Sequence, residues 1–119
     1  ISKISPQKRL VAFSKIKTQP VSVKMSINLA SSTVLIENDI CKLTLWDFAP
    51  GQETGWHTHT MDYVVMPNIS GTLKLVNKDG TEMEVQVSPD KPYFKTSGVN
   101  HNVISVNDFN FSFLEMEFK

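Results

Sequence analysis

The stretch that decides the fold runs from residue 51 to residue 63 and reads Gly51-Gln-Glu-Thr-Gly-Trp-His57-Thr-His59-Thr-Met-Asp-Tyr63. His57 and His59 are two residues apart, so both rings leave the same face of an extended strand. On a helix the same two rings would point in widely different directions. A metal site built on this pair therefore requires a β-strand.

A second stretch, Gly98-Val-Asn-His101, contains the third histidine, and the chain has no other. His101 begins a valine- and isoleucine-containing segment that is typical of another strand. Three isolated histidines would ordinarily be scattered polar residues of the surface or core. Here each lies beside a glycine-containing turn and in a strand-like segment. We therefore predict that His57, His59 and His101 share one inward-facing metal site, because neutral imidazole is a common metal ligand.

Outward from these stretches, short strand patterns alternate with turn residues. The clearest strand is residues 81–87, in which Thr and apolar side chains alternate with Glu and Gln without exception, and the tight-turn signal Asn77-Lys-Asp-Gly80 precedes it. This spacing predicts an antiparallel all-β sandwich or barrel with no helix. Pro67 predicts a bulge or an edge, since its nitrogen cannot donate to a ladder. The predicted strands are 33–37, 40–49, the histidine segment, 63–66, 72–76, 81–87, 92–95, 101–106 and 109–118.

Length and charge exclude several classes of protein. A chain of 119 residues is the size of one domain, and its 12 basic and 12 acidic residues give a formal net charge of zero. No basic field is present to attract nucleic acid or an anionic membrane. No run approaches the roughly 20 apolar residues that span a bilayer, and no signal peptide is recognisable. We expect a small-molecule ligand and no nucleic-acid or membrane partner.

The N-terminal quarter differs in character from the rest. Residues 1–31 mix basic, Ser and Thr residues with single apolar ones, and we expect an extended arm there. Within it, residues 21–29 carry apolar side chains at every second position, the pattern of a half-buried strand. Residues 32–119 form the predicted folded domain. The chain has one cysteine, Cys41, which cannot form an internal disulfide, and this fits a cytoplasmic location.

The two histidine segments resemble the paired motifs of the cupin superfamily. Gly51, His57, His59 and Gly71 match the first motif, but Tyr63 stands where that motif has a glutamate. Gly98 and His101 match the second motif. The residues that depart from the second motif are Asp90, Thr96 and Ser105, at its first Gly, its Pro and its Asn positions.

The resemblance covers about residues 32–118, and the surrounding sequence is most similar to small single-domain bacterial cupins linked to beta-alanine degradation. It implies a jelly-roll or double-stranded β-helix barrel, similar to RmlC, that holds a divalent metal ion inside its mouth. Cupins with three-histidine iron sites include thiol and diketone dioxygenases, so the resemblance favours Fe(II), while Zn, Mn or Ni would fit the same ligands.

Tyr63 is the candidate catalytic residue. Without the motif glutamate, three neutral imidazoles leave the metal its full positive charge, which favours an anionic ligand. The Tyr63 hydroxyl either acts on that ligand as a hydrogen-bond donor or acid-base group, or the ring simply packs.

Two classes of function compete. The first is a metalloenzyme, possessing dioxygenase-like or related metal-assisted chemistry, that acts on a small anionic metabolite. The second is a non-catalytic cupin that binds a small molecule as a sensor or accessory protein. The three histidines favour the enzyme, and the incomplete motifs favour the binding protein.

Other residues allow several roles. Cys41 is a candidate for a cross-link to Tyr63 or Tyr93, of the kind some cupin thiol dioxygenases carry, but Leu43 and Leu45 share its face, as in an ordinary core strand. Aromatic residues that line the pocket, or else pack in the core or a dimer contact, are Trp46, Phe48, Trp56, Tyr93 and Phe94.

Apolar residues on both faces of two strands predict a homodimer. In the strand from Ile40, Trp46 and Phe48 lie opposite Leu43 and Leu45, and the last strand repeats this pattern. A small barrel has one interior, so a second apolar face suggests a second buried surface.

Overall fold

The computed structural model describes residues 28–119, and these residues form nine β-strands with no helix among them. The strands are β1 (Ser31–Glu37), β2 (Cys41–Phe48), β3 (His57–Thr58), β4 (Asp62–Pro67), β5 (Gly71–Asn77), β6 (Glu82–Val87), β7 (Tyr93–Lys95), β8 (Asn100–Ser105) and β9 (Phe111–Phe118). The prediction of an all-β fold is confirmed, and the predicted strand segments match these nine elements closely.

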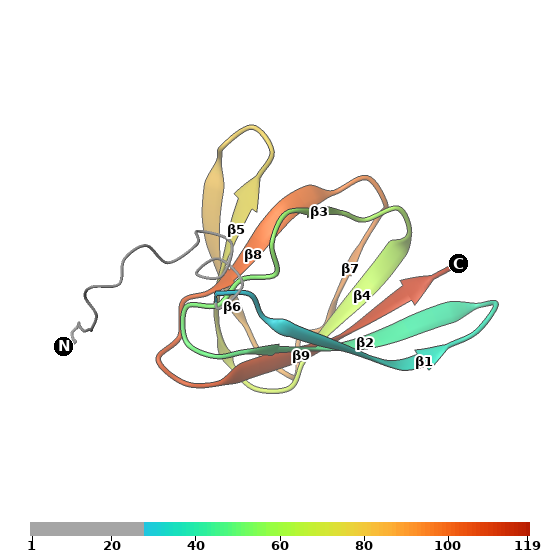
Figure 1. The fold of residues 1–119 in the computed structure, drawn as a ribbon, viewed down its shortest axis with the longest axis horizontal. Coiled ribbons are helices and arrows are strands. Elements are labelled where there is room, and N and C mark those ends of the chain that lie inside the picture. The colour runs from blue at the N-terminus through green and yellow to red at the C-terminus, as the bar shows by residue number, and fades with distance from the viewer. Residues whose placement is uncertain (1–27) are drawn as a thin grey trace, which may run out of the picture.

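The strands form two sheets that face each other, as Figure 1 shows. One sheet has five strands in the order β1-β2-β9-β4-β7, and the other has four in the order β3-β8-β5-β6. The strand pairs within both sheets are antiparallel. Most sheet neighbours are far apart in sequence, because the chain crosses repeatedly between the sheets. This is the antiparallel jelly roll, or double-stranded β-helix, that the family resemblance implies.

The core is densest at one end of the space between the sheets. Phe48 of β2 and Phe111 of β9 are each 1% exposed, and their ring centroids are 6.1 Å apart. Leu73 of β5 closes this cluster from the opposite sheet and is equally buried. Burial of each such side chain contributes about 1.5–3 kcal/mol. Further along the same inner face, Trp46 of β2 lines a cavity instead. The space between the sheets is therefore packed with side chains at one end and contains a cavity at the other.

The structure corrects one prediction about β2. Leu43 and Leu45 were expected on the core face, with Cys41. Instead the buried residues of β2 are Thr44 and Phe48, and the two leucines lie on the outer face of the five-stranded sheet, half-buried. The alternation of the strand was predicted, but both faces are apolar, so the pattern alone does not tell which face the second sheet covers.

Pro67 ends β4 at a local edge, which is one of the two alternatives predicted for it. β7 pairs with β4 only as far as Val65, so the proline nitrogen has no neighbouring strand on that side. The irregularity in register that the structure does show lies elsewhere, in β1 between Val34 and Ile36.

The predicted arm, residues 1–31, and its strand at 21–29 lie almost entirely outside the described residues. At the beginning of the described part, Leu29 forms a parallel bridge with Glu53. No helix in the described part has the length and apolar character needed to cross a bilayer.

Candidate metal centre

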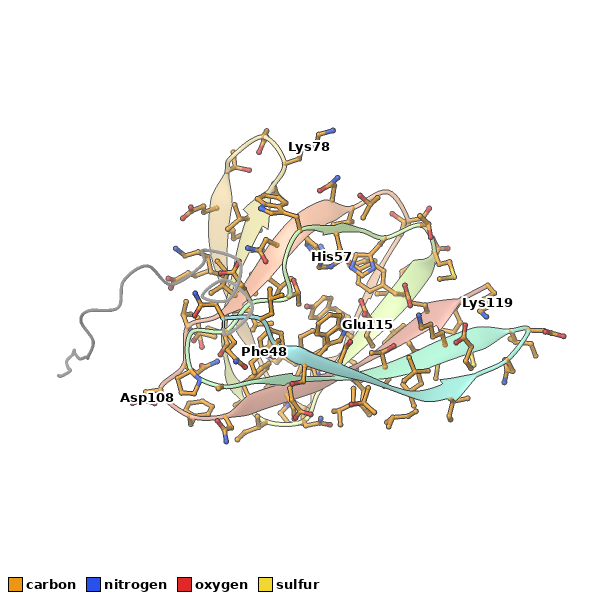
Figure 2. The ribbon with its side chains drawn as sticks, in the orientation of Figure 1. Phe48, His57, Lys78, Asp108, Glu115 and Lys119 are labelled. Carbon is orange, nitrogen blue, oxygen red and sulfur yellow. The ribbon has the colours of Figure 1, made fainter. Side chains whose placement is uncertain are left out.

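The structure brings the three histidines together. His57 of β3 lies directly opposite His101 of β8 in the sheet register, and His59 follows β3 by one residue. His57 Nε2 and His59 Nε2 are 3.0 Å apart, and one nitrogen of each of the three rings lies within 4.8 Å of the others. Figure 2 shows His57 directed into the space between the sheets, with Glu115 of β9 across from it.

Backbone hydrogen bonds join the two histidine segments. The His59 amide donates to the Val99 carbonyl at 2.8 Å, and the Gly98 amide donates to the His59 carbonyl at 2.7 Å. Gly98 has φ +102°, a conformation that side chains other than glycine rarely adopt. The glycine of the second motif therefore lets the loop before β8 turn back onto His59.

The ring of His57 is oriented from behind. His57 Nδ1 is 2.8 Å from the Gly55 carbonyl oxygen and donates to it, because a carbonyl oxygen can only accept. Thr54 Oγ1 lies 3.3 Å from the same Nδ1. The buried side chain of Asn102 holds this loop by accepting from the Gly55 amide at 3.0 Å and donating to Glu53 at 2.7 Å. These contacts leave Nε2 of His57 facing His59. Such outer contacts fix the orientation of metal-ligating histidines.

The donor set fits a divalent metal ion. His101 Nε2 is buried and has no hydrogen-bond partner among the described residues, which is costly for a polar atom unless something binds it. Burial, followed by the nearby His57, lowers the pKa of His59 and of His101 to about 4. Both rings are therefore neutral at pH 7, the form that binds a metal.

Tyr63 lies beside the cluster, on β4. Its side chain is 2% exposed, and its ring stacks on His59 with centroids 3.8 Å apart and planes 17° apart. Burial, with Glu115 nearby, raises the pKa of its hydroxyl well above the ordinary value. The phenol therefore keeps its proton at neutral pH, so Tyr63 is a donor at the edge of the site.

Two glutamates that the sequence analysis did not identify lie on either side of His59. Glu115 Oε2 is 3.4 Å from His59 Nε2, and Glu117 Oε2 is 3.9 Å from His59 Nδ1. Trp46 Nε1 donates to Glu115 Oε1 at 3.0 Å. Burial raises the pKa of Glu115 to about 7, partly offset by the Trp46 hydrogen bond. Since His59 is neutral, the Glu115 contact is not a strong ion pair despite its distance.

The sequence did contain a signal for these glutamates. Phe111 and Phe113 are buried on the inner face of β9, and positions 115 and 117 continue the same alternation. Acidic residues at positions in phase with a buried aromatic face are candidates for a site, because a buried carboxylate needs a partner.

A cavity of about 210 Å³ opens onto the three histidines and Tyr63. Of the five aromatic candidates for its walls, Trp46 and Tyr93 line it. Phe48 belongs to the core, while Trp56 and Phe94 are 57% and 56% exposed. Lys95 also lines the cavity and is the one lysine or arginine among its lining side chains in the described part of the chain.

The cross-link considered for Cys41 is incompatible with the fold. Cys41 pairs with Phe118 on the outer face of the sheet, and its thiol is free. Tyr63 and Tyr93 both line the inner cavity. The sheet itself therefore separates the sulfur from both rings.

Comparisons with known proteins agree with this architecture. No family model matches the chain. The chain is 41% identical over 90 residues to the beta-alanine degradation protein BauB of Pseudomonas aeruginosa. The aligned region covers 76% of this chain and 94% of BauB. The chain is also similar to a cupin domain from Bordetella pertussis Tohama I, whose crystal structure is known. The two share 45% sequence identity and superpose with a TM-score of 0.73 over 76% of this chain and 94% of that one.

A more distant neighbour shows the fold alone. A double-stranded β-helix domain from Klebsiella pneumoniae superposes with a TM-score of 0.62 at 17% identity, over 87% of this chain and 89% of that one. The sequence relationship to BauB and the sheet topology lead to the same conclusion. The chain belongs to the cupin superfamily, among the small bacterial cupins related to the beta-alanine degradation protein.

Proposed function

We propose that this cupin binds one divalent metal ion through His57, His59 and His101 and acts as a metalloenzyme on a small anionic metabolite. The observation that carries the proposal is the convergence of three imidazoles on one cavity, with a buried His101 nitrogen that has no hydrogen-bond partner among the described residues. Fe(II) is the favoured ion, because nitrogen donor sets with open positions suit it and the family includes three-histidine dioxygenases.

The metal, when bound, would supply Lewis-acid or redox chemistry. Residues of the protein orient the histidine rings and limit the access of water. The Gly55 carbonyl and Thr54 hold the His57 ring so that Nε2 faces inward, and the Val99 carbonyl fixes His59 through its backbone. Leu75 and Val103 line the inner wall and reduce access of water to the site.

The size and charge of the cavity support a small anionic substrate. A volume of about 210 Å³ is smaller than the roughly 300–1,000 Å³ typical of sites for drug-sized ligands. Lys95 lines the cavity and provides a cation that a carboxylate can pair with. Because the relative BauB is a beta-alanine degradation protein, beta-alanine and other short carboxylates are the first substrates to test.

Tyr63 is the proposed hydrogen-bond donor to this substrate. Its ring is fixed by stacking on His59, and burial keeps its hydroxyl protonated. A protonated donor stabilises negative charge that develops on a substrate oxygen.

The test is elemental analysis of protein purified without an affinity tag, followed by oxygen-consumption assays with the carboxylate panel, with and without added Fe(II). We expect about one metal ion per chain, and His59→Ala should lose most of it while circular dichroism still reports a β fold. Equal metal content in wild type and variant would contradict the proposed centre. Bound metal and ligand without turnover would instead establish the non-catalytic binding protein.

We also propose that the protein works in the cytoplasm. The one cysteine, Cys41, is a free thiol that is neither paired nor close to the site. Free thiols and ferrous ions are both maintained by a reducing compartment. Fractionation of cells that express the native gene, with immunodetection, checks this.

A further inference from the structure

We propose that Glu115 is a fourth ligand of the metal centre and supplies, from β9, the carboxylate that the first cupin motif places at position 63. This inference rests on the proposed three-histidine centre. Glu115 lies in the five-stranded sheet, whereas His57 and His101 come from the four-stranded sheet. Ligands from both sheets would then hold the ion between them.

The distances around one atom carry the proposal. His59 Nε2 lies 3.0 Å from His57 Nε2 and 3.4 Å from Glu115 Oε2. Two donors that are each about 2.0–2.1 Å from one ion lie about 3.0–3.4 Å apart at octahedral or tetrahedral angles. Both contacts of His59 therefore have the spacing of neighbouring ligands. The donor atoms that all lie within 4.8 Å of one another are those of the three histidines, so the Glu115 carboxylate would close on the ion when it binds. The Glu115 contact is also longer than a usual nitrogen–oxygen hydrogen bond, which is about 2.7–3.2 Å.

Trp46 prepares the carboxylate for this role. Its indole nitrogen donates to Oε1 of Glu115 at 3.0 Å, so the other oxygen remains directed toward His59. Glu115 is 7% exposed, and a carboxylate that is buried needs compensation beyond one hydrogen bond. A divalent cation at the histidine cluster provides that compensation. Trp46 is thus a positioning residue, since it acts through Glu115.

Glu117 completes the arrangement on the other side of the His59 ring. Its Oε2 is 3.9 Å from His59 Nδ1, beyond hydrogen-bond distance, and this buried nitrogen has no hydrogen-bond partner among the described residues. Metal-ligating histidines commonly donate their second ring N–H to a carboxylate, which orients the ring. Glu117 is therefore the carboxylate in place to accept from Nδ1 once the His59 ring shifts onto an ion, while Glu115 faces the nitrogen that would bind the ion.

This assignment accounts for the missing motif glutamate. A carboxylate moved to β9 gives the three-histidine, one-carboxylate donor set, lowers the net charge of the centre by one, and leaves Tyr63 free to contact substrate. Oxygen and nitrogen donors together suit Fe(II), Mn(II), Ni(II) and Zn(II) alike.

The experiment uses Co(II) as a spectroscopic probe of the full chain. Co(II) is titrated into metal-free wild type, Glu115→Gln and a matched control, Glu84→Gln, which alters an exposed glutamate on β6. Affinity is measured by competition with a chelator, and the visible absorption bands report the donor set. We expect Glu115→Gln to bind about 10- to 100-fold more weakly, with shifted bands, while the control matches wild type.

The outcomes separate this inference from the proposed function. Wild type that binds Co(II), with Glu115→Gln equal to the control in affinity and spectrum, would overturn the role of Glu115 and leave the histidine centre standing. Weaker binding with an unchanged spectrum would also overturn direct ligation, because loss of charge alone would explain it. Wild type that binds no metal would refute the proposed function itself.

A second variant guards against a folding defect in Glu115→Gln. Trp46→Phe keeps the carboxylate but removes its hydrogen bond. We expect it to keep the wild-type band positions and to lose affinity by a smaller factor than Glu115→Gln does. A Trp46→Phe spectrum that matches Glu115→Gln in a folded protein would contradict the separate roles assigned to the two residues.

Discussion

At the residue scale, Glu115 combines a cost in stability with a proposed gain in binding. Its pKa rises from the ordinary value of 4.5 to about 7 in the folded protein, mainly through burial. The folded state therefore binds more protons than the unfolded state between these values, and its stability falls as pH rises through that range. Below pH 4.5 both states are protonated and the penalty is absent.

We therefore expect Glu115→Gln to stabilise the metal-free protein more at pH 8 than at pH 4.5. The difference between its effects on the free energy of unfolding at the two pH values should be on the order of 1–3 kcal/mol. The glutamine keeps an acceptor for Trp46 and removes the buried charge. Urea unfolding at the two pH values measures the difference, and an effect that is independent of pH would refute the burial of an ionisable Glu115.

Tyr63 provides a second test at this scale. If it donates to a substrate oxygen, Tyr63→Phe should retain the metal and lose about 10²-fold or more in turnover. In a non-catalytic binding protein the same change would alter ligand affinity by only about 0.5–1.5 kcal/mol. Metal analysis and steady-state kinetics on the substrate found by screening distinguish these results. A variant equal to wild type in both measurements would leave the tyrosine with a packing role alone.

At the scale of the elements, the start of β5 is fixed by a close contact with β9. A Cβ atom added at Gly71 would lie 2.9 Å from Phe111 Cδ1 and 3.0 Å from Asn107 Oδ1. Phe111 is fully packed against Phe48, so its ring cannot move freely. This contact explains the glycine at that position of the first motif, independently of any need for positive φ.

We expect Gly71→Ala to destabilise the fold by about 1–3 kcal/mol, the usual cost of overpacking a core. In a Phe111→Leu background the same substitution should cost clearly less, because the smaller side chain leaves room for the methyl group. Chemical denaturation of the four proteins in this cycle gives the coupling energy. Equal costs in both backgrounds would show that the methyl group does not meet the ring.

At the scale of the whole molecule, the outer face of the five-stranded sheet has no covering layer among the described residues. Side chains that are paired in register form an apolar row across all five strands, namely Ile36, Leu43, Met116, Val64 and Phe94. Ile36 and Phe94, at the ends of this row, are 48% and 56% exposed. A continuous apolar surface of this kind is typical of an interface.

We propose that this face is the interface of a homodimer, in which a second copy covers the row. Light scattering should give twice the chain mass of 13.4 kDa at micromolar concentration. Leu43→Lys should yield the monomer without loss of the β fold, since its side chain lies on the outer face. Ile69→Lys changes an exposed apolar residue outside this row, in the turn between β4 and β5, and should remain dimeric. A 13.4 kDa wild type would contradict the dimer.

The sequence by itself was enough to predict the strands, the all-β class and the three histidines of the candidate metal site. Local alternation fixes which residues form a strand, and the i, i+2 spacing of His57 and His59 is meaningful on a strand alone. Among the motif glycines, Gly98 has a local reason, its positive φ, whereas the reason for Gly71 is its long-range contact with Phe111.

Only the tertiary structure decided which face of each strand is the interior. β2 and β9 are apolar on both faces, so the alternation of their side chains does not show whether Leu43 or Phe48 is a core residue. The position of the second sheet decides it. The same choice turned Glu115 and Glu117 inward to His59, although β9 and the histidine segment are more than fifty residues apart in sequence. Long-range strand pairing sets such contacts. The local pattern shows that Glu115 and Glu117 share a face with Phe111 and Phe113, but it does not show that this face is the interior.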